Sequence, residues 1–108
     1  MSNILEKIIQ YKKESLEIIK KDNTLDFLEK KIKTINTFLN FKETINKNKG
    51  VSLISEIKKA SPSAGILVKD FDHLEIAKMY INNGSTCLSV LTEEKYFLAK
   101  LGYIKDIK

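Results

Sequence analysis

The chain opens with apolar residues spaced as on one face of a helix. Between residues 3 and 21 they recur three and four positions apart, with charged residues mostly on the other side. Asn3 is placed to cap this helix, and Glu6 follows at the capping-box position. The apolar stripe is expected to dock on the protein's own core. Its members are Ile4, Leu5, Ile8, Ile9, Leu16 and Ile19.

A second amphipathic stretch follows a short polar break. Asn23 or Thr24 can cap a helix that runs to about residue 36. A packed segment or short helix is expected over residues 38–45, and the polar sequence NKNKG (46–50) predicts a loop. Residues 1–49 are therefore expected to form a helical N-terminal extension.

The pattern changes to that of strands after residue 50. Residues 51–57 predict a strand and residues 61–69 a loop. Residues 86–91 (TCLSVL) are almost continuously apolar, as expected for a strand covered on both faces. A loop is expected over residues 92–97, and the apolar spacing beyond residue 100 predicts the start of another helix.

One helix is predicted between these two strands. Asp72 can cap it, Glu75 takes the capping-box position, and Gly84 suits the left-handed position after its end. The strands begin about 35 residues apart, which fits a right-handed βαβ unit. Residues 50–108 are thus expected to hold a βαβ unit and a further helix start, within one α/β domain spanning 1–108.

Composition narrows the classes of function. The hydrophobic fraction of 43% excludes a disordered chain, and 108 residues suffice for one small domain. The net charge of +5 invites a nucleic-acid interpretation. However, lysines alternate with acidic residues along the helices, and arginine, the residue best suited to phosphate and base contacts, is absent from the sequence. We therefore expect no nucleic-acid partner.

The sequence also argues against disulfides, metals and a membrane span. The single cysteine, Cys87, allows no internal disulfide, is expected to be buried and inert, and fits a cytoplasmic location. No apolar run approaches the roughly 20 residues of a membrane span. The one histidine, His73, is expected at the surface, and the Glu93–Glu94 pair in solvent. Neither points to a metal site.

The candidate chemistry lies in SEIKKASPSAG, residues 55–65. Because side chains alternate along a strand, Glu56 and Lys58 share one face and Lys59 points to the other. A polar loop follows at once, and a strand end carrying charges before such a loop is typical of barrel enzymes. The alternative is an exposed edge strand with a solvated Glu–Lys pair. The loop residues of interest are Ser61, Pro62 and Ser63.

Two motifs together resemble the indole-3-glycerol phosphate synthase family. SEIKKASPSAG (55–65) and LSVLTEEKYF (88–97) are similar to the first two barrel strands of that family, and residues 70–87 and 4–16 resemble its first barrel helix and its extra N-terminal helix. The resemblance implies a (β/α)8 TIM barrel in tryptophan biosynthesis. The reaction would close the indole ring of 1-(2-carboxyphenylamino)-1-deoxyribulose 5-phosphate, with loss of carbon dioxide and water and without cofactor or metal.

The resemblance also implies roles for individual residues. Lys58 would bind the anionic groups of the phosphate substrate and serve in acid catalysis, and Glu56 would hold the polar network and take part in proton transfer. Ser61 would contact the substrate, with Pro62 and Ser63 beside it. Phe97 would pack against the anthranilate ring.

The sequence departs from the family in two respects. Where the family continues Y-F-x-G-S, this chain reads YFLAK (96–100), which removes the Gly and the capping Ser and weakens the next helix start. A barrel of this type needs about 250 residues, and only two of its eight strands are present. We expect an incomplete barrel that is marginally folded, inactive alone, and dependent on a complementing C-terminal barrel chain.

Two other functions remain open at this stage. A small basic helical interaction protein without catalytic activity would explain the net charge and the amphipathic helices. It gives no reason for a Glu–Lys pair and a Ser-Pro-Ser loop at the end of an apolar strand. Another phosphate-binding barrel, such as phosphoribosylanthranilate isomerase, would not explain the long helical extension.

Overall fold

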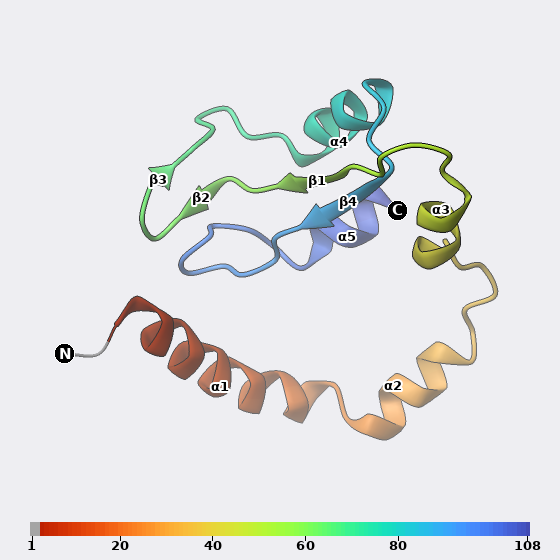
Figure 1. Cartoon of the computed structure of the whole chain (residues 1–108). Coiled ribbons are helices and arrows are strands. Elements are labelled where there is room, and N and C mark those ends of the chain that lie inside the picture. The colour runs from red at the N-terminus through yellow and green to blue at the C-terminus, as the bar shows by residue number, and fades with distance from the viewer. Residues whose placement is uncertain (1–2) are drawn as a thin grey trace. The chain divides into compact units, whose positions relative to one another are not determined.

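The computed structural model describes residues 3–108, which divide into two compact units (Figure 1). The first unit ends at Leu39 and the second spans Asn40–Lys108. Residues 40–49, which the sequence grouped with the helical extension, therefore lie within the second unit.

The first unit consists of two helices, α1 (Ile4–Asp22) and α2 (Leu25–Ile32). The predicted cap of α1 is confirmed, since Asn3 Oδ1 accepts the Glu6 N–H at 2.9 Å. Thr24, not Asn23, caps α2.

Helix α2 ends earlier than predicted. The N–H of Ile35 donates to the Ile32 carbonyl, and the Thr34 hydroxyl donates to the Lys31 carbonyl at 2.8 Å. These bonds tighten the last turn and use carbonyls that a continuing helix would need.

The expectation that the stripe of α1 docks on a core stays a prediction, because the first unit has no buried core of its own. Neither α1 nor α2 contains a buried residue, and apolar side chains such as Leu5 and Leu25 are mostly exposed. Capping and ion pairs such as Lys30–Asp26, 2.9 Å apart, support these helices locally. Exposed pairs of this kind contribute about 0.3–0.5 kcal/mol.

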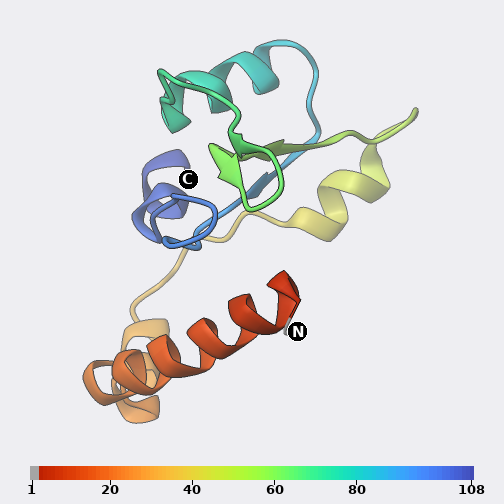
Figure 2. The same cartoon turned by 90° about the vertical axis from the view of Figure 1, so that its left-hand side faces the viewer.

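The second unit is built around a two-stranded parallel sheet. Strand β1 (Ile54–Ile57) pairs with β4 (Cys87–Val90), and helix α4 (His73–Asn82) connects them (Figures 1 and 2). Helix α4 packs against β1 and against α5 (Gly102–Ile107), while α3 (Phe41–Lys47) contacts β4. The predicted βαβ order is confirmed, with strands shorter than expected.

A small hairpin occupies the segment that was predicted to be a loop. Strands β2 (Ala60–Ser61) and β3 (Gly65–Ile66) pair in antiparallel fashion. Gly65 has a φ of +67°, a conformation that glycine adopts without strain. The backbone N–H groups of the two residues after β3 donate to the Lys59 carbonyl, which closes the hairpin. The sequence predicted a turn in this segment but not the pairing of β2 with β3.

The core of the second unit is small. Ser55 and Ile57 on β1 are buried, whereas Ile54 and Glu56 on the other face are exposed, as alternation requires. Strand β4 is only half-buried at all its positions, so the prediction of a strand covered on both faces is wrong. Cys87 is likewise half-buried rather than buried. The buried apolar residues are Ile57, Ala60, Ala77 and Ala99.

His73 is not the simple surface residue that the sequence predicted. Its Nε2 lies 2.8 Å from Asp106 Oδ2, and its ring stacks on Tyr103 with centroids 4.1 Å apart. These contacts join the start of α4 to α5. The sequence could not reveal them, because the partners lie on separate helices.

The cap of α4 provides a test of local stability. Asp72 Oδ1 accepts the N–H groups of Leu74 and Glu75 at 2.9 and 3.1 Å. Asp72→Ala is expected to lower the free energy of unfolding by about 1 kcal/mol, since it leaves both donors unpaired. Urea unfolding followed by circular dichroism measures this. Asp70→Ala is the control, because Asp70 is exposed and makes none of the hydrogen bonds described for residues 3–108. An equal loss in both variants would contradict the capping role.

Candidate functional site

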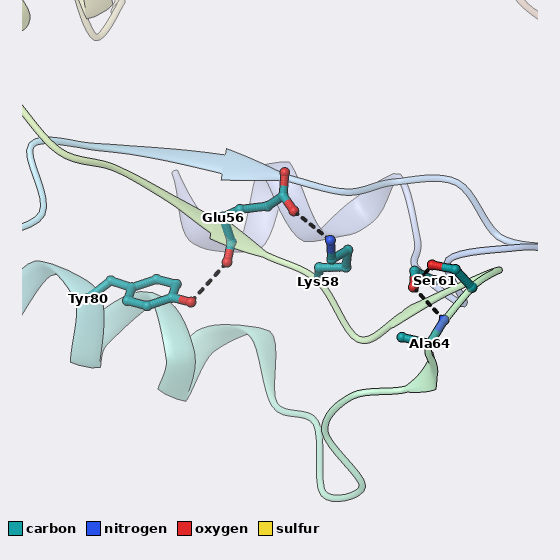
Figure 3. A network of polar contacts seen from close by, with 6 residues as sticks. Glu56, Lys58, Ser61, Ala64 and Tyr80 are labelled. Carbon is teal, nitrogen blue, oxygen red and sulfur yellow. Dashed lines mark hydrogen bonds and ion pairs between the residues drawn. The ribbon is translucent and has the colours of Figure 1, made fainter.

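The centre of the candidate site is an ion pair on the exposed face of β1. Lys58 Nζ lies 3.1 Å from Glu56 Oε1, and the two side chains are 34% and 49% exposed (Figure 3). The prediction that both point to one face is therefore confirmed. The pair lies at the carboxyl end of β1, so the strand presents an ammonium group and a carboxylate together.

Helix α4 holds the backbone of this pair in place. The Tyr80 hydroxyl donates to the Glu56 carbonyl at 2.9 Å (Figure 3). The neighbouring Ile57 carbonyl accepts from Leu91 N–H just beyond β4. Because successive carbonyls of a strand point to opposite edges, the Glu56 carbonyl faces the edge that β4 leaves unpaired. The sequence placed Tyr80 only on the apolar face of its helix and missed this contact.

The hydroxyl-rich loop follows β1 directly. Ser61 Oγ accepts the Ala64 N–H at 3.2 Å and lies 3.5 Å from Ser63 Oγ (Figure 3). Pro62 and Ser63 are exposed, and Ser61 is half-buried. The loop therefore places two hydroxyl groups, one exposed and one half-buried, just past Lys58.

The loop after β4 is organised by Glu93. Its carboxylate accepts three consecutive backbone N–H groups, from Lys95 at 2.9 Å, Tyr96 at 2.7 Å and Phe97 at 3.0 Å. The prediction that both Glu93 and Glu94 are simply solvated is thus wrong for Glu93, which is half-buried, while Glu94 is exposed. The sequence signal for this role was the position of Glu93, an acidic residue shortly after the end of β4.

The same loop curls back on its own start, as Figure 2 shows. Ala99 is buried, and its N–H donates to the Glu93 carbonyl at 2.9 Å. Leu98 has a φ of +52°, which costs a residue with a Cβ about 1–2 kcal/mol. Phe97, the predicted ring-packing residue, directly precedes Leu98 and is half-buried.

Helix α5 begins without help from a side chain, as the missing serine predicted. Leu101 stands at its N-cap and makes no capping hydrogen bond. The departure from the family motif therefore leaves the helix start uncapped, and the loop before it is closed by Glu93 instead.

The described residues were found to contain neither a metal-binding cluster nor a helix suited to span a membrane. Within residues 3–108, no three His, Cys, Asp or Glu side chains are grouped so as to hold a metal ion. None of the helices in that range combines the length and apolar character that a membrane span requires.

Comparison with known proteins decides the ancestry of the chain. The family model described as indole-3-glycerol phosphate synthase matches residues 5–108. The chain belongs to the indole-3-glycerol phosphate synthase family. It is 46% identical over 112 residues to the indole-3-glycerol phosphate synthase of Aliarcobacter butzleri and 43% identical over 105 residues to that of Desulforamulus reducens.

These matches cover 97% of this chain but only 41% and 40% of the two relatives, respectively. The synthase of Clostridium acetobutylicum gives the same picture, with 43% identity over 106 residues and 40% of its length. The chain thus spans about 40% of the curated relatives it matches. The barrel is the fold of the family, and residues 3–108 show helices and short sheets without a closed barrel.

Proposed function

We propose that the second unit supplies the first part of an indole-3-glycerol phosphate synthase active site. In this proposal β1, α4 and β4 are the first strand, first helix and second strand of the family's barrel. The supporting observation is the Glu56–Lys58 ion pair at the carboxyl end of β1, within a segment that the family model matches. That end of a barrel strand is where barrel enzymes place their chemistry.

The charges of the pair suit the proposed substrate. 1-(2-Carboxyphenylamino)-1-deoxyribulose 5-phosphate carries a carboxylate and a phosphate, so a lysine at the strand end attracts it. Ring closure requires a proton on the carbonyl oxygen and later the loss of water, and both steps need a positioned acid. Lys58 takes the role of proton donor, and Glu56, 3.1 Å away, directs its ammonium group.

The two loops complete this part of the site. Ser61 and Ser63 offer hydroxyl groups beside Pro62, immediately after β1, and are assigned to substrate binding. Phe97 is assigned to the anthranilate ring, since an aromatic side chain packs well against another ring. Both loops follow parallel, paired strands, so they leave the sheet at the same end.

The activity is proposed to need a further barrel chain. Leu53, just before β1, is 53% exposed, and Ile54, the first residue of β1, is 49% exposed. The parallel sheet of the described residues has two strands. Covering these side chains and the unpaired strand edges would stabilise the sheet. We assign that cover to a C-terminal barrel portion corresponding to the part of the relatives that this chain does not match.

The test is reconstitution from two chains. The 108-residue chain is mixed with a separately expressed C-terminal portion of the Aliarcobacter butzleri relative, and indole-3-glycerol phosphate is measured by its indole fluorescence. We expect no product from either chain alone and product from the mixture. The N-terminal portion of that relative, cut at the corresponding position, is the matched control.

Two outcomes contradict the proposal. Ring closure by the 108-residue chain alone would show that no further chain is needed. A mixture that stays inactive, while the control portion restores activity to the same partner, would show that this chain no longer carries the synthase function.

A further inference from the structure

The carboxylate of Glu93 has a role that the proposed chemistry does not use. We propose that Glu93 is a positioning residue, which shapes the β4–α5 loop and so places the Phe97 ring for contact with the aromatic acid portion of the substrate. This inference rests on the proposed function, because it concerns the same site.

The hydrogen bonds to Glu93 determine the course of the loop. Oε1 accepts from Lys95 N–H, and Oε2 accepts from both Tyr96 and Phe97 N–H. The Glu93 carbonyl also accepts the Ala99 N–H, so both the side chain and the main chain of Glu93 hold the loop. Hydrogen bonds to an ionised acceptor are stronger than those between neutral groups, which suits a carboxylate to this task.

The loop needs such a restraint because its backbone is strained. Leu98 adopts a left-handed conformation at a φ of +52°, directly after Phe97. Without the carboxylate, three adjacent N–H groups would lose their acceptor and Leu98 would relax toward ordinary backbone angles. The direction of the preceding Phe97 side chain would change with it.

The location of the loop links this restraint to the site. Val90, at the end of β4, pairs in register with Ile57 of β1. The strands are parallel, so the loop that begins after Leu91 leaves the sheet at the end where Lys58 follows β1. Both oxygens of Glu93 accept backbone N–H groups of the loop, so we assign it an action through Phe97 rather than contact with the substrate.

The test compares Glu93→Gln with Glu94→Gln in the 108-residue chain, with amide exchange measured on the chain alone and anthranilate binding measured after mixing with the C-terminal portion of the Aliarcobacter butzleri relative. The two variants each remove one negative charge, at adjacent positions, but only Glu93 accepts the three N–H groups. A glutamine has one acceptor oxygen, so it can serve Lys95 or the Tyr96–Phe97 pair but not all three. Amide hydrogen exchange by NMR reports the loop bonds, and titration with anthranilate, read from the Phe97 ring resonances, reports the placement of the ring.

In Glu93→Gln we expect at least one of the three amides to exchange about tenfold faster or more, since bonds to a charged acceptor are lost. The dissociation constant for anthranilate should rise by a similar factor. Glu94→Gln should change neither. Equal exchange in both variants would overturn the inference, and so would unchanged anthranilate binding in Glu93→Gln.

A failure of the proposed function gives a different experimental result from a failure of the role of Glu93. If the unsubstituted two-chain mixture forms product but shows no response of Phe97 to anthranilate, while Glu93→Gln still frees the amides, the ring-binding role of Phe97 is refuted. Control of the loop by Glu93 is then supported by the exchange data alone.

Discussion

Lys58→Met is expected to lower the kcat of ring closure in the reconstituted two-chain assembly by about 10²–10⁴-fold, the usual contribution of a positioned general acid. Methionine keeps the length and apolar stem of lysine but donates no proton. It also leaves Glu56 without its partner at 3.1 Å. The kcat is measured from indole fluorescence at saturating substrate.

Lys59→Met is the matched control for this variant. Lys59 is the next residue, and the structure gives it no ion pair among residues 3–108. Binding of each variant to the complementing chain is measured separately, which distinguishes a loss of chemistry from a loss of assembly. Equal activity of the two variants would contradict the assignment of Lys58.

Ile57→Ala is expected to have the largest effect on stability. Ile57 is 1% exposed and is the only large apolar side chain among the buried residues of the described chain. Its truncation should lower the free energy of unfolding by about 2–5 kcal/mol, from lost burial and the cavity left behind. A small unit whose other buried apolar residues are alanines has little stability to lose, so the second unit is expected to unfold.

Ile54→Ala is the control, since Ile54 lies on the same strand but is 49% exposed. It should cost clearly less than Ile57→Ala. Dispersion of the amide resonances of β1 and β4, together with urea unfolding, measures both variants. Native-like spectra for Ile57→Ala, or equal losses in the two variants, would show that the core does not depend on this side chain.

Helix starts could be predicted from the sequence because they are decided locally. Asn3 and Asp72 accept N–H groups two or three residues ahead of them, and such bonds need no other part of the chain. Helix and strand ends were harder to predict. The end of α2 depends on competing bonds in its last turn, and the length of β1 depends on how much of β4 is present to pair with it.

The sequence by itself determined that Glu56 and Lys58 share a face, because strand alternation is a property of the backbone. The family motifs confined the candidate site to residues 55–65 and 88–97, because each motif is a contiguous stretch of the sequence. Only the tertiary structure decided that Tyr80 holds the Glu56 carbonyl, that His73 pairs with Asp106, and how Glu93 closes its loop. The first two contacts join side chains or backbone from separate elements, so neighbouring residues in the sequence could not specify them. The third is local, but its loop includes Leu98 in a left-handed conformation, which a residue with a Cβ rarely adopts and which the sequence did not predict.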